Sequence, residues 1–223
     1  MSESEPVDPD RFPDEQTAFC LTGPAGRIEC LADVPEADAR VPAAVVLCHP
    51  HPQHGGTMRN KVVTIMERAL REAGLSTMRF NFRGAGDSEG SFDGGSGELE
   101  DLLAVVDWVR RTRPDDDLWL GGFSFGAWIS LRAAQDLPVR MLISIAPPVE
   151  RYGFSDLMPP NCPWLVVQGD DDDVVSPKAV MEWAERLDRK PDLVVMDGSD
   201  HFFHRRLMDL RGLIKNAVQP HLP

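Results

Sequence analysis

Short apolar runs and segments with helical periodicity alternate along the chain from residue 43 onward. The run AAVVLC at 43–48 is uninterrupted, which is typical of a strand buried on both faces. The segment after it has apolar residues three or four apart, as one face of a helix requires: Val62, Ile65, Met66, Ala69 and Leu70. This alternation predicts an α/β fold with a mostly parallel central sheet of about eight strands and helices on both faces, because parallel strands need crossover connections.

The N-terminal part of the chain follows a different pattern. Strand-like segments at 16–22 and 27–33 flank the turn sequence Gly-Pro-Ala-Gly, which predicts an antiparallel hairpin. Before the hairpin, residues 1–15 combine six acidic residues and three prolines with few large apolar side chains. This composition predicts a flexible acidic tail at 1–15, followed by a single domain at 16–223.

Length and composition narrow the class of protein. With 223 residues, 42% of them hydrophobic and 26% charged, the chain has the balance of one ordinary globular domain. No apolar run approaches the roughly 18 residues of a membrane span, and the N-terminus lacks the basic and apolar segments of a signal peptide. The four cysteines fall singly, so we expect a cytoplasmic protein without a disulfide framework. A net charge of −13 without a basic run argues against a nucleic-acid partner.

The sequence Gly-Phe-Ser-Phe-Gly at 122–126 lies between a predicted strand and a predicted helix. A serine on such a sharp turn exposes its hydroxyl, and close packing of the turn leaves little room for side chains two residues to either side. We therefore predict Ser124 as a nucleophile. The amide of Phe125, at the start of the helix, is a candidate donor to an oxyanion. The alternative is a glycine-rich turn whose serine only caps the helix.

A serine nucleophile needs a general base, usually a histidine that a carboxylate orients. His201 follows the last predicted strand, at the edge of the sheet where ligands bind, and is expected to open the final helix. His204, one helical turn further on, is the less favoured candidate. The preceding predicted strand ends in four consecutive aspartates, Asp170 to Asp173, and spacing alone does not choose among them.

Several segments together resemble the α/β-hydrolase superfamily, and within it a group of small bacterial serine hydrolases without a lid. The segments are HPHPQHGGTMRNK, FNFRGAGDSEG, GGFSFGAW, and QGDDDDVVSP with GSDHFFHRRL. The resemblance covers nearly all of residues 16–223. It implies the α/β-hydrolase fold and a serine hydrolase that uses no cofactor and no metal ion, but it is not specific for a substrate.

The resemblance also assigns roles to individual residues. In the superfamily the acid of the triad stands three residues after a glycine, and counting from Gly169 implies Asp172. Gln168 stands where a histidine is usual, and we expect this departure not to affect the chemistry. The second oxyanion donor comes from the loop after the third strand, where the resemblance implies the amide of His51, with that of Gln53 as the reserve.

The connection from Pro147 to Cys162 is only about sixteen residues long, at the place where many relatives insert a lid. We therefore expect no large lid and an open pocket. Apolar side chains on this connection and beside the predicted base are expected to line the pocket: Tyr152, Phe154, Met158 and Phe202.

Two other classes of function stay open from the sequence. His49, His51 and His54 form the pattern H-x-H-x-x-H, which is similar to a metallo-β-lactamase motif and whose spacing allows imidazoles to share one zinc ion. A non-catalytic binding protein on a hydrolase fold is the other, because fold does not imply function.

The favoured interpretation is a serine hydrolase of the carboxylesterase kind that acts on esters with short to medium acyl chains. It would use the triad of Ser124, Asp172 and His201 and form an acyl-enzyme intermediate. The expected partner is a small-molecule acyl substrate, with no nucleic acid and no membrane span, and the expected state is a monomer or a homodimer.

Overall fold

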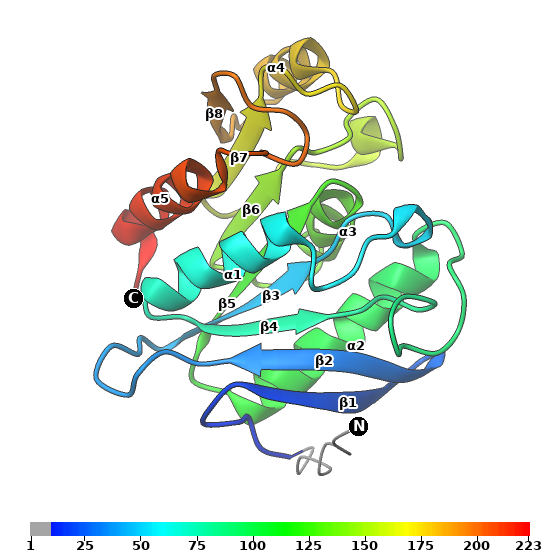
Figure 1. The fold of residues 1–223 in the computed structure, drawn as a ribbon, viewed down its shortest axis with the longest axis vertical. Helices are drawn as coiled ribbons and strands as arrows, with labels where there is room; N and C mark the ends of the chain where they lie inside the picture. The colour runs from blue at the N-terminus through cyan, green and yellow to red at the C-terminus, as the bar shows by residue number, and fades with distance from the viewer. Residues whose placement is uncertain (1–9) are drawn as a thin grey trace.

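One eight-stranded sheet, in the order β1-β2-β4-β3-β5-β6-β7-β8, runs through the part of the chain that the structure describes (Figure 1). The structure is a computed structural model, and it describes residues 10–223. The strands are β1 (Thr17–Gly23), β2 (Gly26–Asp33), β3 (Ala43–Cys48), β4 (Ser76–Phe80), β5 (Asp117–Phe123), β6 (Met141–Ile145), β7 (Trp164–Gly169) and β8 (Asp192–Met196).

The pairing of the strands confirms the predicted sheet. β1 and β2 form an antiparallel hairpin in which Gly23 pairs with Gly26, and β2 also pairs antiparallel with β4. All remaining neighbours, from β4 through β3 to β8, are parallel. The carboxyl ends of these parallel strands therefore meet at one edge, where the loops that follow them can form a site.

Helices cover both faces of the sheet (Figure 1). They are α1 (Lys61–Glu72), α2 (Ser96–Thr112), α3 (Phe125–Ala133), α4 (Pro177–Arg186) and α5 (Leu207–Val218), with short 3₁₀ turns η1 (Pro52–His54), η2 (Phe154–Asp156) and η3 (Gln219–His221). Buried side chains of α1 and α5 share one apolar cluster, and those of α2, α3 and α4 share another on the opposite face.

The central strand β3 shows why its sequence is apolar without interruption. Val45 and Leu47 belong to the cluster under α1 and α5, whereas Val46 and Cys48 belong to the cluster under α2 and α3. Successive side chains of a strand point to opposite faces, so a strand covered on both faces needs an apolar residue at every position.

Two boundaries differ from those predicted from the sequence. Residues 1–9 of the predicted acidic tail lie outside the described residues, but Phe12 is buried, with 3% of its surface exposed, and its ring lies 5.5 Å from that of Trp108. The packed chain therefore begins before Gln16. The final helix starts at Leu207 rather than at His201, after a segment in which Phe203 has a positive φ of 53°.

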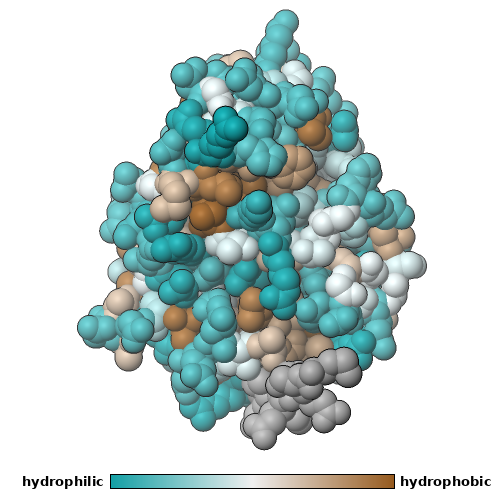
Figure 2. Space-filling model, in the orientation of Figure 1, coloured by the Kyte–Doolittle hydropathy of each residue, from teal (hydrophilic) through white to brown (hydrophobic). Residues whose placement is uncertain are grey.

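The connection between β6 and β7 contains one short 3₁₀ turn, η2, so the structure has no large lid over the carboxyl edge of the sheet. Hydrophilic residues cover most of the face seen in Figure 2, and hydrophobic residues occur there in small groups. Within residues 10–223, none of the helices has the length and apolar character needed to cross a bilayer.

Candidate active site

Ser124 lies at the corner between β5 and α3, in a backbone conformation that residues with a side chain rarely adopt. Its φ is 53° and its ψ is −117°. The Ser124 amide donates to the carbonyl oxygen of Ile145 on the neighbouring strand at 2.8 Å, which holds the corner against the sheet. Such strain persists where the surroundings fix it, and it occurs often at functional positions.

Glycines on either side of Ser124 allow the corner to pack closely. A Cβ atom at Gly122 would lie 2.1 Å from the carbonyl oxygen of Gly126, and one at Gly126 would lie 2.3 Å from that of Cys48. Neither approach is possible for a larger residue without moving the backbone. The glycines of the Gly-Phe-Ser-Phe-Gly sequence are therefore required by contacts between the turn, α3 and the end of β3.

His201 and Asp172 form a buried pair at the ends of β8 and β7. His201 Nδ1 lies 2.8 Å from Asp172 Oδ2, and only 3% of the His201 surface is exposed. The amides of Val174 and Val175 donate to the other carboxylate oxygen at 2.9 and 2.7 Å. Burial by itself raises the pKa of Asp172, but the hydrogen bonds from His201 and from the two amides outweigh it, so the pKa is lowered.

The four consecutive aspartates differ in burial, and this separates them. Asp172 is buried, whereas Asp170, Asp171 and Asp173 are exposed. Asp170 accepts a long hydrogen bond of 3.4 Å from the Ser199 amide, a contact within the loop. Of the four carboxylates, only that of Asp172 pairs with a histidine in the described chain.

Gln168 makes a side-chain contact with Asp172 that was not predicted from the sequence. Its Nε2 donates to Asp172 Oδ2 at 2.9 Å, so the same carboxylate oxygen accepts hydrogen bonds from both His201 and Gln168. The side chain at this position therefore contacts Asp172 directly, and the expectation that the change from histidine to glutamine leaves the chemistry unaffected stays a prediction. The signal was available in the spacing, since a side chain near the end of β7 lies close to the acid that follows that strand.

Ser124 and His201 line the same cavity, which has a volume of about 400 Å³. No hydrogen bond joins their side chains within residues 10–223. Contacts of this kind in a free enzyme are often long and tighten only when substrate binds. His204 does not line this cavity, and its Nδ1 lies 2.7 Å from the Asp200 carboxylate on the surface.

The two candidate oxyanion donors lie on opposite sides of Ser124 in the chain. Phe125 is the first residue of α3, where the backbone amides have no partner within the helix. His51 precedes η1, and its carbonyl oxygen accepts the amides of His54 and Gly56, both at 3.1 Å, which closes the loop into a tight turn. His51 and Phe125 both line the cavity.

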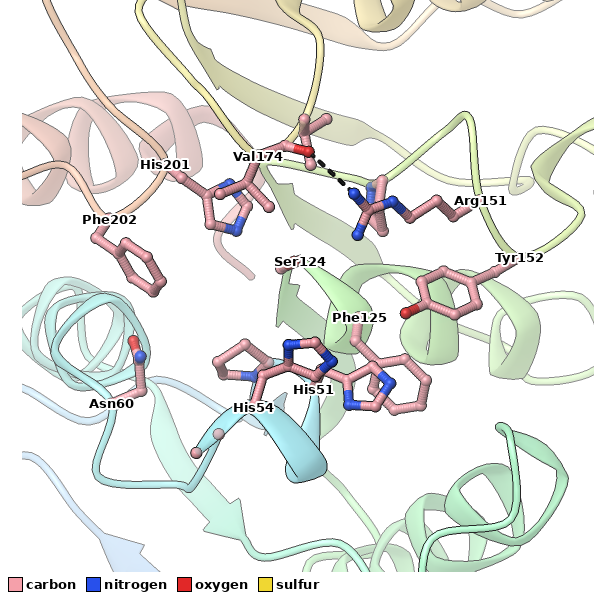
Figure 3. A pocket seen from close by; sticks show the side chains of 15 residues that line it. His51, His54, Asn60, Ser124, Phe125, Arg151, Tyr152, Val174, His201 and Phe202 are labelled. Carbon is pink, nitrogen blue, oxygen red and sulfur yellow. Dashed lines mark hydrogen bonds between the residues drawn. The ribbon is translucent and has the colours of Figure 1, made fainter.

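Half of the predicted apolar lining is in place (Figure 3). Tyr152 and Phe202 line the cavity. Phe154 does not, because it is buried in the core with 2% exposed, against Trp183. Met158 does not either, since it is 66% exposed and lies by a separate hollow near Gln135. These two positions of the sequence analysis are corrected by the structure.

A model of the alpha/beta hydrolase fold matches residues 43–162. The chain belongs to this family. It is similar to the crystal structure of an α/β serine hydrolase without a lid from Xanthomonas campestris, with 53% identity, coverage of 96% of this chain and 98% of that one, and a TM-score of 0.92. It is also similar to an α/β serine hydrolase homologue from Coxiella burnetii, with 47% identity, coverage of 92% and 98%, and a TM-score of 0.89.

A curated protein of Rickettsia prowazekii, described as uncharacterized, is 41% identical over 212 residues, which are 89% of this chain and 87% of that protein. The family match and the two solved structures together support a hydrolase. They confirm the resemblance to lidless α/β serine hydrolases on which the sequence analysis relied.

In this α/β hydrolase the histidine cluster is not arranged to hold a metal ion. His49 is fully buried, its Nδ1 donates to the Pro50 carbonyl at 2.6 Å, and its Nε2 accepts the Phe82 amide at 3.0 Å. Both ring nitrogens are therefore used by the backbone. Within residues 10–223, no group of three or more histidine, cysteine or acidic side chains is placed to bind a metal.

The buried imidazole of His49 gives the α/β hydrolase a pH-dependent stability. Burial lowers its pKa from an ordinary value of 6.5 to about 4. As the pH falls below 6.5 the unfolded chain binds a proton that the folded chain refuses, so this contribution is complete above pH 6.5 and is lost toward pH 4. We expect wild type to lose roughly 2 kcal/mol of unfolding free energy through this group between pH 7 and 5.

Urea unfolding at pH 7 and pH 5 measures this loss. His49→Gln removes the titrating group, so the variant should be less stable at pH 7 but should show a smaller fall between the two pH values. An equal fall in wild type and variant would show that His49 is not the group responsible.

Proposed function

We propose that this protein is a serine hydrolase of carboxylic esters with short to medium acyl chains. In this proposal Ser124 is the nucleophile, His201 the general base and Asp172 the acid that orients it. The observation that carries the proposal is the buried hydrogen bond of 2.8 Å between His201 and Asp172, behind a cavity that both His201 and Ser124 line. Its cytoplasmic location and its state as a monomer or homodimer stay predictions.

The reaction begins when Ser124 Oγ attacks the acyl carbon and His201 Nε2 takes the hydroxyl proton. The carbonyl oxygen becomes an oxyanion, which the amides of Phe125 and His51 stabilise by donating hydrogen bonds. The intermediate then collapses, the ester C–O bond breaks, and His201 gives its proton to the departing alcohol. Water attacks the acyl-enzyme with His201 acting again as base, which releases the carboxylic acid and restores Ser124.

Asp172 is suited to stay ionised while His201 becomes positively charged. Its two oxygens accept four hydrogen bonds, from His201, Gln168, Val174 and Val175. A carboxylate with this many donors keeps a low pKa and can stabilise an imidazolium beside it. An ionised carboxylate can only accept hydrogen bonds, so His201 Nδ1, which faces it, carries the proton. His201 Nε2 is then unprotonated and can act as the base.

A serine-directed fluorophosphonate probe tests the proposal against a non-catalytic binding protein. We expect rapid labelling of Ser124, identified by peptide mass spectrometry, together with hydrolysis of nitrophenyl butyrate. Protein that is folded but neither labelled nor active on esters would favour a binding function on the same fold.

We expect short acyl chains to be preferred, with nitrophenyl butyrate hydrolysed at a higher kcat/KM than nitrophenyl palmitate. Each methylene adds roughly 0.8 kcal/mol of binding only while it enters an apolar channel. The cavity holds about 400 Å³, and the connection above it contributes one 3₁₀ turn rather than a covering helix. Methylenes beyond the cavity stay in water and add nothing to transition-state binding.

The measurement is kcat/KM for acyl groups of two to sixteen carbons, at concentrations below micelle formation. A profile that still rises beyond about twelve carbons would contradict this reading of the cavity, because each added methylene would then have to enter an apolar channel.

A further inference from the structure

The cavity beside Ser124 has a charge balance opposite to that of the whole protein. The chain contains 36 acidic and 23 basic residues. Within the described residues, however, the charged lining of this cavity is Arg151, with no aspartate or glutamate. A concave site lined by one sign of charge concentrates ligands of the other sign. The cavity therefore favours a substrate that carries a negative charge.

Arg151 is the permanent cation of this lining, and its charge is not neutralised. Its guanidinium donates one long hydrogen bond of 3.4 Å to the Val174 carbonyl oxygen, drawn as a dashed line in Figure 3. Within residues 10–223 it makes no other hydrogen bond and no ion pair. A guanidinium has five N–H donors, so most of them are available to a ligand. The tether to Val174 limits the positions that the guanidinium can take.

The backbone turns sharply at this point and brings Tyr152 beside Arg151. Tyr152 has a φ of 59° and Gly153 a φ of 60°, two successive residues in the left-handed region. This conformation is an outlier for a tyrosine. The ring of Tyr152 stacks on that of Trp128 at 4.8 Å and meets the edge of the Phe125 ring at 5.5 Å, which holds the turn in place.

The hydroxyl of Tyr152 points toward the cavity in Figure 3. None of the residues from 10 to 223 forms a hydrogen bond with it. Burial raises the pKa of Tyr152 and nearby Arg151 lowers it, so the phenol keeps its proton at neutral pH and can donate it to an acceptor. A guanidinium and a phenol O–H at one end of a cavity are a donor set suited to a carboxylate.

The position of these donors relative to the triad indicates which part of the substrate they meet. The alcohol of an ester leaves on the side of His201, because that residue protonates it. Phe202 and Asn60 lie on the same side of Ser124 as His201, whereas Arg151 and Tyr152 lie across Ser124 from them (Figure 3). Arg151 and Tyr152 therefore face the acyl part of a bound ester.

We propose that Arg151 and Tyr152 bind a carboxylate at the far end of the acyl group, so that the preferred substrates are half-esters of short dicarboxylic acids. This inference rests on the proposed ester hydrolysis at Ser124. It adds the chemical class of the acyl group and a reason for a short chain, since the cavity ends at a charged group.

The test compares monoethyl glutarate with ethyl pentanoate, which has an acyl chain of the same length without the second carboxylate. We expect wild type to have a kcat/KM at least about tenfold higher for the half-ester, the gain of one charge-assisted hydrogen-bonded pair. Arg151→Gln should bring the ratio of the two kcat/KM values close to 1, Arg151→Lys should restore part of it, and Tyr152→Phe should lower it less than Arg151→Gln does.

Arg110→Gln is the matched control, because it removes the same charge from the exposed face of α2, away from the cavity. Its ratio should equal that of wild type. An equal fall in Arg110→Gln and Arg151→Gln would mean that only the overall field of the protein matters, which overturns the assignment. A wild-type ratio near 1 overturns it too.

A second ester places the carboxylate on the alcohol instead, as the butanoyl ester of glycolic acid. A preference for this ester over ethyl butanoate that Arg151→Gln leaves intact would place the anion site on the side of the departing alcohol, and it would contradict our proposal.

Binding of glutarate to Ser124→Ala, measured by calorimetry, separates the two proposals. If wild type hydrolyses no ester, but Arg151→Gln abolishes the binding of glutarate to Ser124→Ala, the proposed function is overturned and the carboxylate site is supported. Ester hydrolysis by wild type, with neither a preference for the half-ester nor glutarate binding that depends on Arg151, would support the proposed function and overturn the carboxylate site.

Discussion

Replacing Ser124 with alanine is expected to lower kcat/KM for nitrophenyl butyrate by about a thousandfold or more, because the group that forms the acyl-enzyme is removed. The fold should survive the change. Ser124 already holds its strained φ of 53° with a Cβ atom, so alanine adds no new backbone cost. Its amide bond to the Ile145 carbonyl, which fixes the corner, does not involve the side chain. Steady-state kinetics and thermal unfolding of the purified variant measure the two effects.

Ser130→Ala is the matched control for this variant. Ser130 lies on the same helix, α3, and its hydroxyl donates to the Ala127 carbonyl within that helix, away from the cavity. It should keep most of the activity. Fluorophosphonate labelling that persists in Ser124→Ala would show that another residue is the nucleophile.

Asp172→Asn is expected to lower kcat by about 10⁴-fold while the protein stays folded. An amide in place of the carboxylate presents one acceptor oxygen and one NH₂ group to four donors. Whichever way the amide turns, its NH₂ faces either His201 and Gln168 or the amides of Val174 and Val175. With the NH₂ group toward His201, the proton must move to Nε2, and the base is then blocked.

The neighbouring aspartates are the controls for this change. Asp170→Asn and Asp173→Asn remove the same charge from exposed positions without touching His201, so each should keep most of the activity. If Asp173→Asn were the most damaging of the three, the assignment of the acid to Asp172 would be refuted. Circular dichroism of each variant verifies that the fold is intact.

The parts of the structure that follow from local pattern were predictable from the sequence. The uninterrupted run of β3 reflects burial on both faces, and the Gly-Pro-Ala-Gly turn fixes the hairpin of β1 and β2. The sharp turn at Ser124 was predictable for the same reason, since its close contacts require glycine at positions 122 and 126, within five residues of sequence. Where local sequence preference and tertiary packing favour the same conformation, that conformation can be predicted from the sequence.

The parts that depend on distant contacts were not predictable. Phe12 reads as part of an acidic tail, but it is buried because the ring of Trp108 on α2 lies beside it. Phe154 and Met158 are both apolar residues of the same connection, so the sequence does not distinguish them as pocket residues. In the structure, Phe154 lies in the core at η2, whereas Met158 is exposed on the surface. The left-handed conformation of Tyr152, next to Arg151, is rare for a tyrosine, so the residue type does not predict it.

In the proposed mechanism, the position of His201 after β8 also determines when the protein can become active. During synthesis, the chain through α4 already contains the His51 loop, Ser124 and Asp172, whereas His201 follows β8, which is the last strand in chain order and lies at the edge of the sheet. β8 pairs with β7, so His201 can reach its position beside Asp172 only when β8 has joined the sheet. Domains fold as units, and contacts between distant segments form slowly because of their loop-closure entropy. In the proposed mechanism the nascent chain is therefore inactive, and hydrolysis begins only after the domain has folded.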